Sequence, residues 1–599
     1  MDHKRPKPSE LPELLPGIQN FDKLRKKNAL YVDKTKFFPM LLKKGVVVFC
    51  ARPRRFGKSL TVSALDAFFS GRKDLFQRLA ALEFMNSRRF TPKPVIRLDL
   101  SEADDCETRD DLEEAIRSCL RVNAKRHKVS LRGNRCLTAF SNLLEDVHDA
   151  TSQKIVLLID EYDSPVISLI QRELTYDPKL VEQTRNFMRS FYSKIKSSDE
   201  YLDFVFITGI SKFSRMGVFS PLNNLVDISL DSDFAAFMGL TQKELEINFA
   251  PYIKSTAKQL RLSEKELLEH IRDYYDGFSF DGRTRVYNPF SALLFFEDRE
   301  FNNYWMESGS NGLIRKFLLD KKLTVEEFSG LRVSKNFARM PGEIGATPPE
   351  GFLFQAGYLT LRKGSDGSYT LDYPNFEVRT ALSALFMENL YSSERMAAAA
   401  AAELDQYMAA GDVPNIVVIF MSLYSGLSSQ DHREAVSVKM DEDVLTGMAL
   451  EQAEKRRGLS EPNSALSFLE ALRLKKGENF YRSVLQACLW SIGADVRPEA
   501  SKNLGQADMD VRYKDQDYII EMKIAKDSPA ALKSAQAGLT QIRSRKYGGA
   551  SKNPILISLA VDLEERNIGA CIFVKNGQTY VLDSQDLLRL REPPAEKAD

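Results

Sequence analysis

The fold of the N-terminal half is decided by residues 46–59, which have the sequence VVVFCARPRRFGKS. A run of β-branched and aromatic residues leads into a turn, and the turn leads into a helix that opens with Gly57, Lys58 and Ser59. Strand, turn and helix in this order are typical of a phosphate-binding loop. The full pattern GxxxxGK[ST] requires glycine where Arg52 stands, so a basic loop that merely contains Gly-Lys-Ser is the alternative.

The residue types of this loop suit the binding of a nucleoside triphosphate. Backbone N–H groups at a helix N-terminus bind phosphate oxygens. The Lys58 ammonium would reach the β- and γ-phosphates, and the Ser59 hydroxyl would ligate Mg²⁺. We therefore predict that ATP is bound by the whole loop, comprising Arg52, Pro53, Arg54, Arg55, Phe56, Gly57, Lys58 and Ser59.

A second apolar strand, residues 154–161 (KIVLLIDE), ends in two acids. Asp160 is predicted to help hold Mg²⁺, and Glu161 to polarise the attacking water. A third strand, 204–208, ends at Thr208, which together with Ser211 is a candidate sensor of the γ-phosphate. The alternative for residues 154–161 is a strand that stops at a solvated acidic turn.

Short apolar runs alternate with helical patterns throughout the first 240 residues. The runs at 46–50, 95–100, 155–159 and 204–208 predict buried strands of a parallel α/β sheet. Residues 352–361 and 368–373 are predicted to form a strand pair. The predicted parts are an extended lead-in (1–17), an α/β domain (18–240), a mixed α+β region (241–390), a helical region (391–468), a C-terminal α/β domain (469–592) and a tail (593–599).

Composition excludes several classes of protein. The 599 residues include 84 Lys and Arg against 83 Asp and Glu, so any contact with nucleic acid must come from a local basic surface. Residues 117–135, which carry seven basic residues and no acid, are the candidate. The favoured alternative is that they form a solvated helix face and loop. Six scattered cysteines indicate a reducing compartment. No secretory signal or membrane-spanning run is visible, which predicts a cytoplasmic protein without a membrane partner.

A second chemical centre is predicted near the C-terminus. Asp508 and Asp510 alternate along one strand, while Glu521 and Lys523 alternate along the next. Because strand side chains repeat every two residues, each pair lies on one face. If the strands form a hairpin, carboxylates from both can bind Mg²⁺ or Mn²⁺, which activates water for phosphodiester hydrolysis, and Lys523 would orient that water.

Two further residues can join this centre. Glu478 opens an amphipathic helix and is an additional candidate metal ligand, as is Asp510. Gln541 lies on a later helix that could face the same cleft. The alternative is a hairpin whose charged face is simply solvated.

These motifs together resemble a family of bacterial AAA-ATPase-like proteins with a C-terminal PD-(D/E)XK nuclease-superfamily domain. The resemblance extends over about residues 15–390 and resumes over 477–550. The matching strings include 31–35 (YVDKT), 52–59 (RPRRFGKS), 159–163 (IDEYD), 208–214 (TGISKFS), 287–289 (YNP) and 374–378 (PNFEV).

The resemblance implies a P-loop domain at 18–240 and a restriction-endonuclease-like domain at 469–592. Asp508, Glu521 and Lys523 match the family pattern of Gly-x-x-Asp followed by Glu-x-Lys. Arg52 in place of the first loop glycine is typical of the family. Nucleic acid is the implied partner, DNA in preference to RNA, and a homo-oligomer is expected because such ATPases often complete their site with a neighbour's arginine.

The leading hypothesis is an ATP-hydrolysing switch coupled to a metal-dependent nuclease, with a role in defence or mobile-element biology by analogy only. One rival is a nucleotide-switched scaffold whose nuclease fold only binds a partner. Another is an ATPase that remodels proteins.

Overall fold

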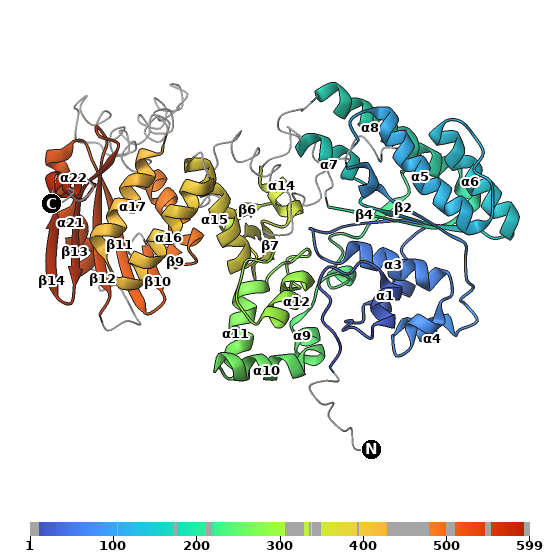
Figure 1. The fold of residues 1–599 in the computed structure, drawn as a ribbon, viewed down its shortest axis with the longest axis horizontal. Coiled ribbons are helices and arrows are strands. Elements are labelled where there is room, and N and C mark those ends of the chain that lie inside the picture. The colour runs from blue at the N-terminus through green and yellow to red at the C-terminus, as the bar shows by residue number, and fades with distance from the viewer. Residues whose placement is uncertain are drawn as a thin grey trace, which may run out of the picture. The chain divides into compact units, whose positions relative to one another are not determined.

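The computed structural model divides into two compact units, Met1–Lys321 with Phe328–Arg379, and Lys322–Glu327 with Thr380–Asp599 (Figure 1). The finer domain limits predicted from the sequence stay a prediction. The structure describes residues 11–104, 106–171, 177–210, 219, 221–305, 329–334, 337, 349–391, 394–427, 478–498, 509–544 and 553–591.

A five-stranded parallel sheet forms the centre of the N-terminal unit. Its strands lie in the order β2-β3-β4-β1-β5. The first four strands occupy the apolar runs predicted from the sequence. The strands are β1 (Val47–Ala51), β2 (Val95–Asp99), β3 (Ile155–Asp160), β4 (Leu202–Gly209) and β5 (Leu225–Asp227).

Helices cover both faces of this sheet, which explains why its strands are continuously apolar (Figure 1). On one face α5, α6 and α8 share a core with the strands. The opposite face carries α3 and the short N-terminal helices. The helices are α1 (Phe21–Lys26), α2 (Phe38–Leu41), α3 (Lys58–Phe69), α4 (Ala81–Met85), α5 (Arg109–His127), α6 (Cys136–Thr151), α7 (Ser164–Gln171) and α8 (Pro178–Ser197).

The rest of the N-terminal unit is mixed α and β. Four helices share an aromatic core that includes Tyr275, Tyr287 and Phe295. A three-stranded antiparallel sheet has the order β6-β8-β7. The elements are α9 (Gln242–Asn248), α10 (Ala250–Leu260), α11 (Glu264–Tyr275), α12 (Pro289–Asp298), β6 (Leu331–Val333), α14 (Pro349–Ala356), β7 (Thr360–Lys363) and β8 (Tyr369–Asp372), followed by α15 (Phe376–Tyr391), within which the boundary between the units falls.

The strand predicted at 352–361 was partly wrong. Residues through Ala356 belong to α14, and the strand begins only at Thr360. Gly357 has a φ of +92°, a conformation that suits the residue just beyond a helix. A short apolar run cannot by itself be assigned to helix or strand. Gly357 was the residue that could have indicated the end of a helix.

The C-terminal unit is built on a six-stranded sheet of order β14-β13-β12-β11-β10-β9. Only β11 and β12 are parallel, and the connection between them is α21, as parallel strands require. The elements are α16 (Glu394–Ala410), α17 (Val413–Ser425), a helix at 478–491, β9 (Asp495–Pro498), β10 (Met509–Tyr513), β11 (Gln516–Ala525), α21 (Ser528–Ser544), β12 (Ile555–Asp562), β13 (Asn567–Lys575), β14 (Gln578–Leu582) and α22 (Ser584–Arg591).

Helices cover both faces of this sheet as well. Tyr518 of β11 donates a hydrogen bond to the Met408 carbonyl of α16, and Tyr424 of α17 contacts Met522. The opposite face of β11 is covered by α21. Both sheets therefore confirm the predicted fold class, a P-loop-type α/β domain, a mixed and helical middle and a nuclease-type α/β domain. None of the described helices is both long and apolar enough to cross a membrane.

Candidate functional site

A cavity of about 750 Å³ lies at the carboxyl end of β1 in the N-terminal unit. The loop residues from Arg54 to Ser59 line it. Gly57, with a φ of +82°, directly precedes α3, whose first residue is Lys58. The first N–H groups of a helix lack partners within the helix, so they are available to an anion in this cavity.

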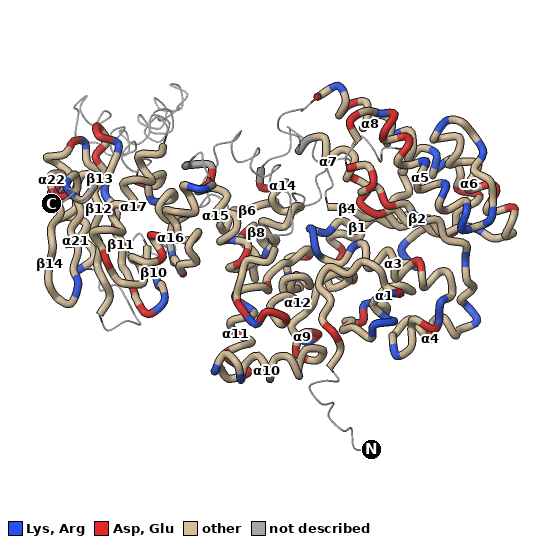
Figure 2. Tube along the Cα trace, in the orientation of Figure 1, with Lys and Arg blue, Asp and Glu red and all other residues tan. Residues whose placement is uncertain are grey.

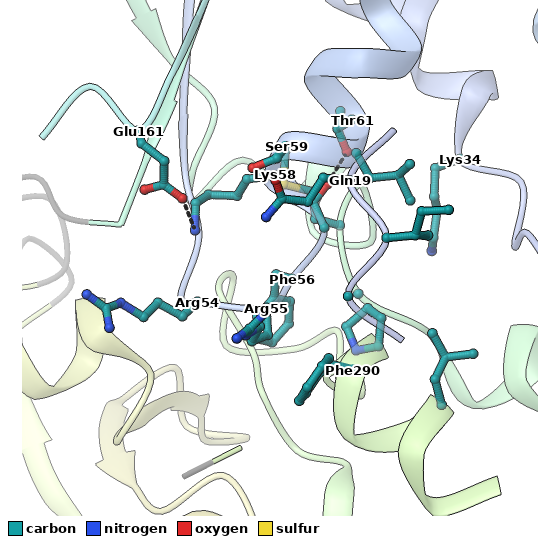
Figure 3. A pocket seen from close by; sticks show the side chains of 18 of the residues that line it. Gln19, Lys34, Arg54, Arg55, Phe56, Lys58, Ser59, Thr61, Glu161 and Phe290 are labelled. Carbon is teal, nitrogen blue, oxygen red and sulfur yellow. Dashed lines mark hydrogen bonds and ion pairs between the residues drawn. The ribbon is translucent and has the colours of Figure 1, made fainter. Parts of the chain in front are cut away.

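Lys58 and Glu161 meet inside the cavity (Figure 3). The Lys58 Nζ lies 3.6 Å from Glu161 Oε1 and 3.3 Å from the Pro53 carbonyl oxygen, with only 4% of the lysine side chain exposed. Glu161 has a left-handed backbone (φ +49°), which turns the chain sharply after β3. The loop ammonium and the acid after β3 are thus within reach of one ligand.

Asp160 is fully buried beside them. Burial raises its pKa from the ordinary 3.8 to about 7, with Glu161 and Asp99 adding to the rise and Ser59 and Lys58 opposing it. Its Oδ1 accepts a hydrogen bond from the Glu161 N–H. Oδ2 has no hydrogen-bond partner among the described residues. A buried, unpaired carboxylate oxygen next to a serine hydroxyl suits a divalent cation.

The structure adds three acids that the sequence analysis did not assign. Asp99, at the end of β2, and Asp104 and Asp163 also line the cavity. Both Asp163 oxygens accept from the Ile210 N–H, at 3.3 and 3.2 Å. The signal that could have found Asp99 is its position at the end of a parallel strand, because such strand ends lie at one edge of the sheet.

Four predicted ligands, Arg52, Pro53, Asp160 and Thr208, are not among the residues that line the cavity. The Arg52 side chain is buried and donates to backbone carbonyls, including that of Ser229, so it is bound within the protein and does not enter the cavity. Thr208 is fully buried. Its hydroxyl, which was predicted to sense the γ-phosphate, donates a hydrogen bond to the Cys50 carbonyl at 2.7 Å. Ser211, the other sensor candidate, lies outside the described residues.

Much of the remaining lining of the cavity is apolar, although Gln19 and Lys34 also contribute to it. The apolar residues come from before β1 and from the mixed region. Arg55, a residue of the loop, borders this part, with its guanidinium 4.7 Å from the centre of the Phe290 ring. The apolar lining residues are Leu15, Ile18, Leu30, Val32, Phe237, Met238, Leu240, Phe249, Phe290 and Leu293. One end of the cavity therefore suits phosphate and the other a flat apolar group.

The C-terminal unit brings four of the polar residues discussed above together. Glu521, on β11, is 0% exposed, and its Oε1 accepts from Lys523 Nζ at 2.9 Å and from the Gln541 amide of α21. Lys523 Nζ also lies 3.4 Å from Glu478 Oε1. Glu521 is buried and contacts a cation and an amide. The alternative interpretation, a strand whose charged face is solvated, does not describe it.

The register of β10 and β11 places Asp510. Asp510 is paired with Ile519 and therefore shares the face of Glu521, but it is exposed. Burial of part of the carboxyl raises its pKa, while Arg497 opposes the rise. Asp508 lies outside the described residues. Within the described residues no group of three or more His, Cys, Asp or Glu could hold a metal ion.

Small residues allow α21 to approach Glu521. A Cβ on Gly538 would lie 2.3 Å from the Ser558 hydroxyl and 3.5 Å from Glu521 Cγ. Substitution of Gly538 would therefore push α21 away from Ser558 of β12, the strand next to β11. The position of the Gln541 amide against Glu521 depends on this close packing.

Several basic residues of the stretch 117–135 are paired with acids that lie outside it. Arg126 donates to both Asp66 oxygens, at 2.9 and 2.6 Å, and Arg121 forms an ion pair with Glu114 at 2.6 Å. Arg132 pairs with two acids of α6. Figure 2 shows acidic and basic residues interleaved along α5 and α6. Part of the positive charge of this stretch is therefore compensated, while Lys125, Lys128 and Arg135 are exposed.

Comparisons with known proteins identify both regions. Residues 16–219 match the family model described as "Predicted AAA-ATPase", and residues 476–570 match that of the PD-(D/E)XK nuclease superfamily. The chain joins an AAA-ATPase-like domain to a PD-(D/E)XK superfamily domain. The elements β1, α3 and β3, which border the cavity, lie in the AAA-ATPase-like domain. Glu521 lies in the PD-(D/E)XK domain.

A relative with the same overall extent is found in Azotobacter chroococcum mcd 1. It carries the description "Uncharacterized protein in vnfD 5'region". The two chains are 29% identical over 537 residues, which cover 89% of this chain and 92% of the relative. The similarity therefore spans both domains and the region between them.

Proposed function

We propose that the AAA-ATPase-like domain binds and hydrolyses ATP with Mg²⁺, and that the PD-(D/E)XK domain hydrolyses nucleic acid, DNA in preference to RNA, with Mg²⁺ or Mn²⁺. The observation that carries the proposal is the cavity at the start of α3. There Lys58 and Glu161 lie 3.6 Å apart beside the buried Asp160.

The residues of the cavity can be given separate roles. The Lys58 ammonium and the first N–H groups of α3 would hold the β- and γ-phosphates. Ser59 and Asp160 would hold Mg²⁺, which would neutralise charge on the phosphates. Glu161, freed from Lys58 when phosphate takes its place, would accept a proton from the attacking water.

The apolar end of the cavity supports a nucleoside rather than inorganic phosphate or a small phosphorylated acid. A purine base is flat and mostly apolar, and burying it among aliphatic and aromatic side chains is favourable. The Phe290 ring lies at the boundary between this end and the loop, next to Arg55. A base and a triphosphate would thus occupy opposite ends of one cavity.

In the PD-(D/E)XK domain we propose that Glu521 and Asp508 are metal ligands and that Glu478 and Asp510 are secondary candidates. The support for Asp508 is the sequence pattern, in which it alternates with Asp510 on the strand that precedes the Glu521 strand. The bound metal would activate water, and Lys523 would be released from Glu521 to stabilise charge on the scissile phosphate.

The test is cleavage of DNA and RNA by the intact chain, with and without ATP and with Mg²⁺, Mn²⁺ or EDTA. Metal-dependent cleavage that requires ATP supports coupled domains. Cleavage without ATP indicates an independent nuclease. ATP turnover without cleavage favours the rivals, a nucleotide-switched scaffold or a protein-remodelling ATPase. Failure of Lys58→Ala to reduce nucleotide binding would exclude the proposed ATP site.

We further propose a cytoplasmic location. None of the six cysteines, all of which the structure describes, forms a disulfide, and most are buried. Oxidising compartments favour paired cysteines, so this usage supports a reducing one.

A further inference from the structure

Arg52 occupies the first position of the phosphate loop, yet its side chain is directed away from the nucleotide cavity. Only 1% of the residue is exposed. Its Nη1 donates to the carbonyls of Ala51 (2.9 Å) and Ser229 (2.7 Å), and its Nη2 donates to the carbonyl of Phe234 (3.0 Å). The guanidinium therefore joins the start of the loop to the segment that follows β5.

An aromatic ring packs on the same guanidinium. The Arg52 Cζ lies 4.0 Å from the centre of the Phe280 ring, close enough for a cation–π contact. Phe56, near the end of the loop, packs edge-on against Phe278 and Phe280, at 5.0 and 5.6 Å between ring centres. Both ends of the loop thus contact residues 278–280, which we call the aromatic segment.

The middle of the loop is held from the same side. A Cβ on Gly357 would lie 2.7 Å from Pro53 and 3.3 Å from the Trp305 ring, so these groups are closely packed. Trp305 also contacts Tyr358 and lies 6.4 Å from Phe278 between ring centres. Trp305 is therefore adjacent to both the loop and the aromatic segment.

The backbone of the loop needs such support. Arg55 has a φ of +67°, in the left-handed region that non-glycine residues rarely adopt. A residue held there costs free energy that its surroundings must supply. The hydrogen bonds of Arg52 to three carbonyls are contacts that a glycine at this position could not make.

We propose that Arg52 is a positioning residue. It holds the phosphate loop in the conformation that binds nucleotide, and it couples that conformation to the packing of the aromatic segment. Coupling of this kind is reciprocal, so nucleotide binding should tighten the aromatic segment, and loosening the segment should weaken nucleotide binding. The inference rests on the proposed nucleotide binding.

The test measures the dissociation constants of a fluorescent ATP analogue and of ADP for the full-length chain. Arg52→Ala should weaken both by roughly tenfold or more, within the range of coupled sites. Arg52→Lys should also bind both nucleotides more weakly than the wild type, because one ammonium cannot replace the forked guanidinium. The matched control is Arg25→Ala: the Arg25 guanidinium also donates to two backbone carbonyls, those of Leu75 and Gln77, and its loss should leave both affinities unchanged.

A second readout uses the fluorescence of Trp305 in a Trp490→Phe background. Nucleotide should change this signal in the otherwise wild-type chain, and Phe280→Leu should reduce both the change and the affinity. If Arg52→Ala does not fold, Phe280→Leu decides: reduced affinity supports the proposal, and unchanged affinity overturns it.

Different results would overturn this proposal and the proposed ATP site. Wild-type affinity and a wild-type Trp305 response in folded Arg52→Ala, together with lost binding in Lys58→Ala, would overturn the positioning role alone. Absence of nucleotide binding by the wild-type chain would overturn the ATP site itself.

Discussion

Replacement of Asp160 by asparagine should stabilise the nucleotide-free and metal-free protein at pH 8. Burial raises the pKa of this carboxyl to about 7, whereas the unfolded chain would ionise it near the ordinary 3.8. Above pH 4, folding must therefore either take up a proton or bury a charge. Both cost free energy, and asparagine removes that cost.

The size of the effect follows from two opposing contributions. The difference between 3.8 and about 7 corresponds to at most ~4 kcal/mol of lost stability at neutral pH. Asparagine would place an amide nitrogen at the Oδ2 position, which has no partner among the described residues. An unpaired buried donor costs about 1–3 kcal/mol. The expected net gain is therefore about 1–3 kcal/mol at pH 8.

The pH dependence has a definite sign. Because the folded pKa is the raised one, wild-type stability is fully present below pH 3.8 and is lost as the pH rises toward 7. Asparagine does not titrate. The advantage of Asp160→Asn should therefore grow between about pH 4 and pH 7, level off above pH 7, and vanish or reverse at about pH 4.

The assay is urea unfolding in EDTA without nucleotide, followed by Trp305 fluorescence in a Trp490→Phe background, since Trp305 belongs to the same unit as Asp160. The control is Asp273→Asn on the exposed face of α11, which should change stability by no more than about 0.5 kcal/mol. A loss of stability in Asp160→Asn that is constant with pH would refute the reasoning. On the proposed function, Mg²⁺-ATP should stabilise the wild type and not the variant.

Five further substitutions test the two centres separately. Lys58→Ala should abolish ATP binding, measured by calorimetry, because backbone N–H groups cannot replace the ammonium; unchanged affinity would exclude the phosphate loop. Glu161→Gln should retain binding and slow phosphate release by about a hundredfold or more, since an amide cannot accept the proton; wild-type turnover would mean that another group positions the water. Asp508→Ala and Glu521→Ala should each remove metal-dependent cleavage and leave ATP turnover near wild type, with Asp510→Ala milder; cleavage by Glu521→Ala would remove it from the metal site.

Much of the N-terminal site could be predicted because its signals are local. Buried parallel strands are short, continuously apolar runs, and a phosphate loop is defined by the residues between one strand and the next helix. Gly57, Lys58 and Ser59 therefore lie at the start of α3, where the local pattern predicts them, and their binding of phosphate stays a prediction. Asp160 and Glu161 were selected for the same reason, because they come at the end of an apolar run.

The side-chain partners of Arg52 and Thr208 could not be predicted, for the opposite reason. Each belongs to a recognisable motif, but the direction of its side chain depends on acceptors far away in the chain. Arg52 is bound by the carbonyls of Ser229 and Phe234, and Thr208 by that of Cys50. The net charge of the basic stretch was overestimated for the same reason, since acids that pair with it, such as Asp66, lie outside it.

The sequence by itself determined the strands, the phosphate loop and the alternation that puts Glu521 and Lys523 on one face. These properties depend on backbone geometry over a few residues. Only the tertiary structure decided that Glu521 is buried against Gln541, that Lys523 also meets Glu478, and that an apolar chamber adjoins the phosphate loop. Burial and the choice of partner depend on how distant segments pack together, which no local pattern encodes.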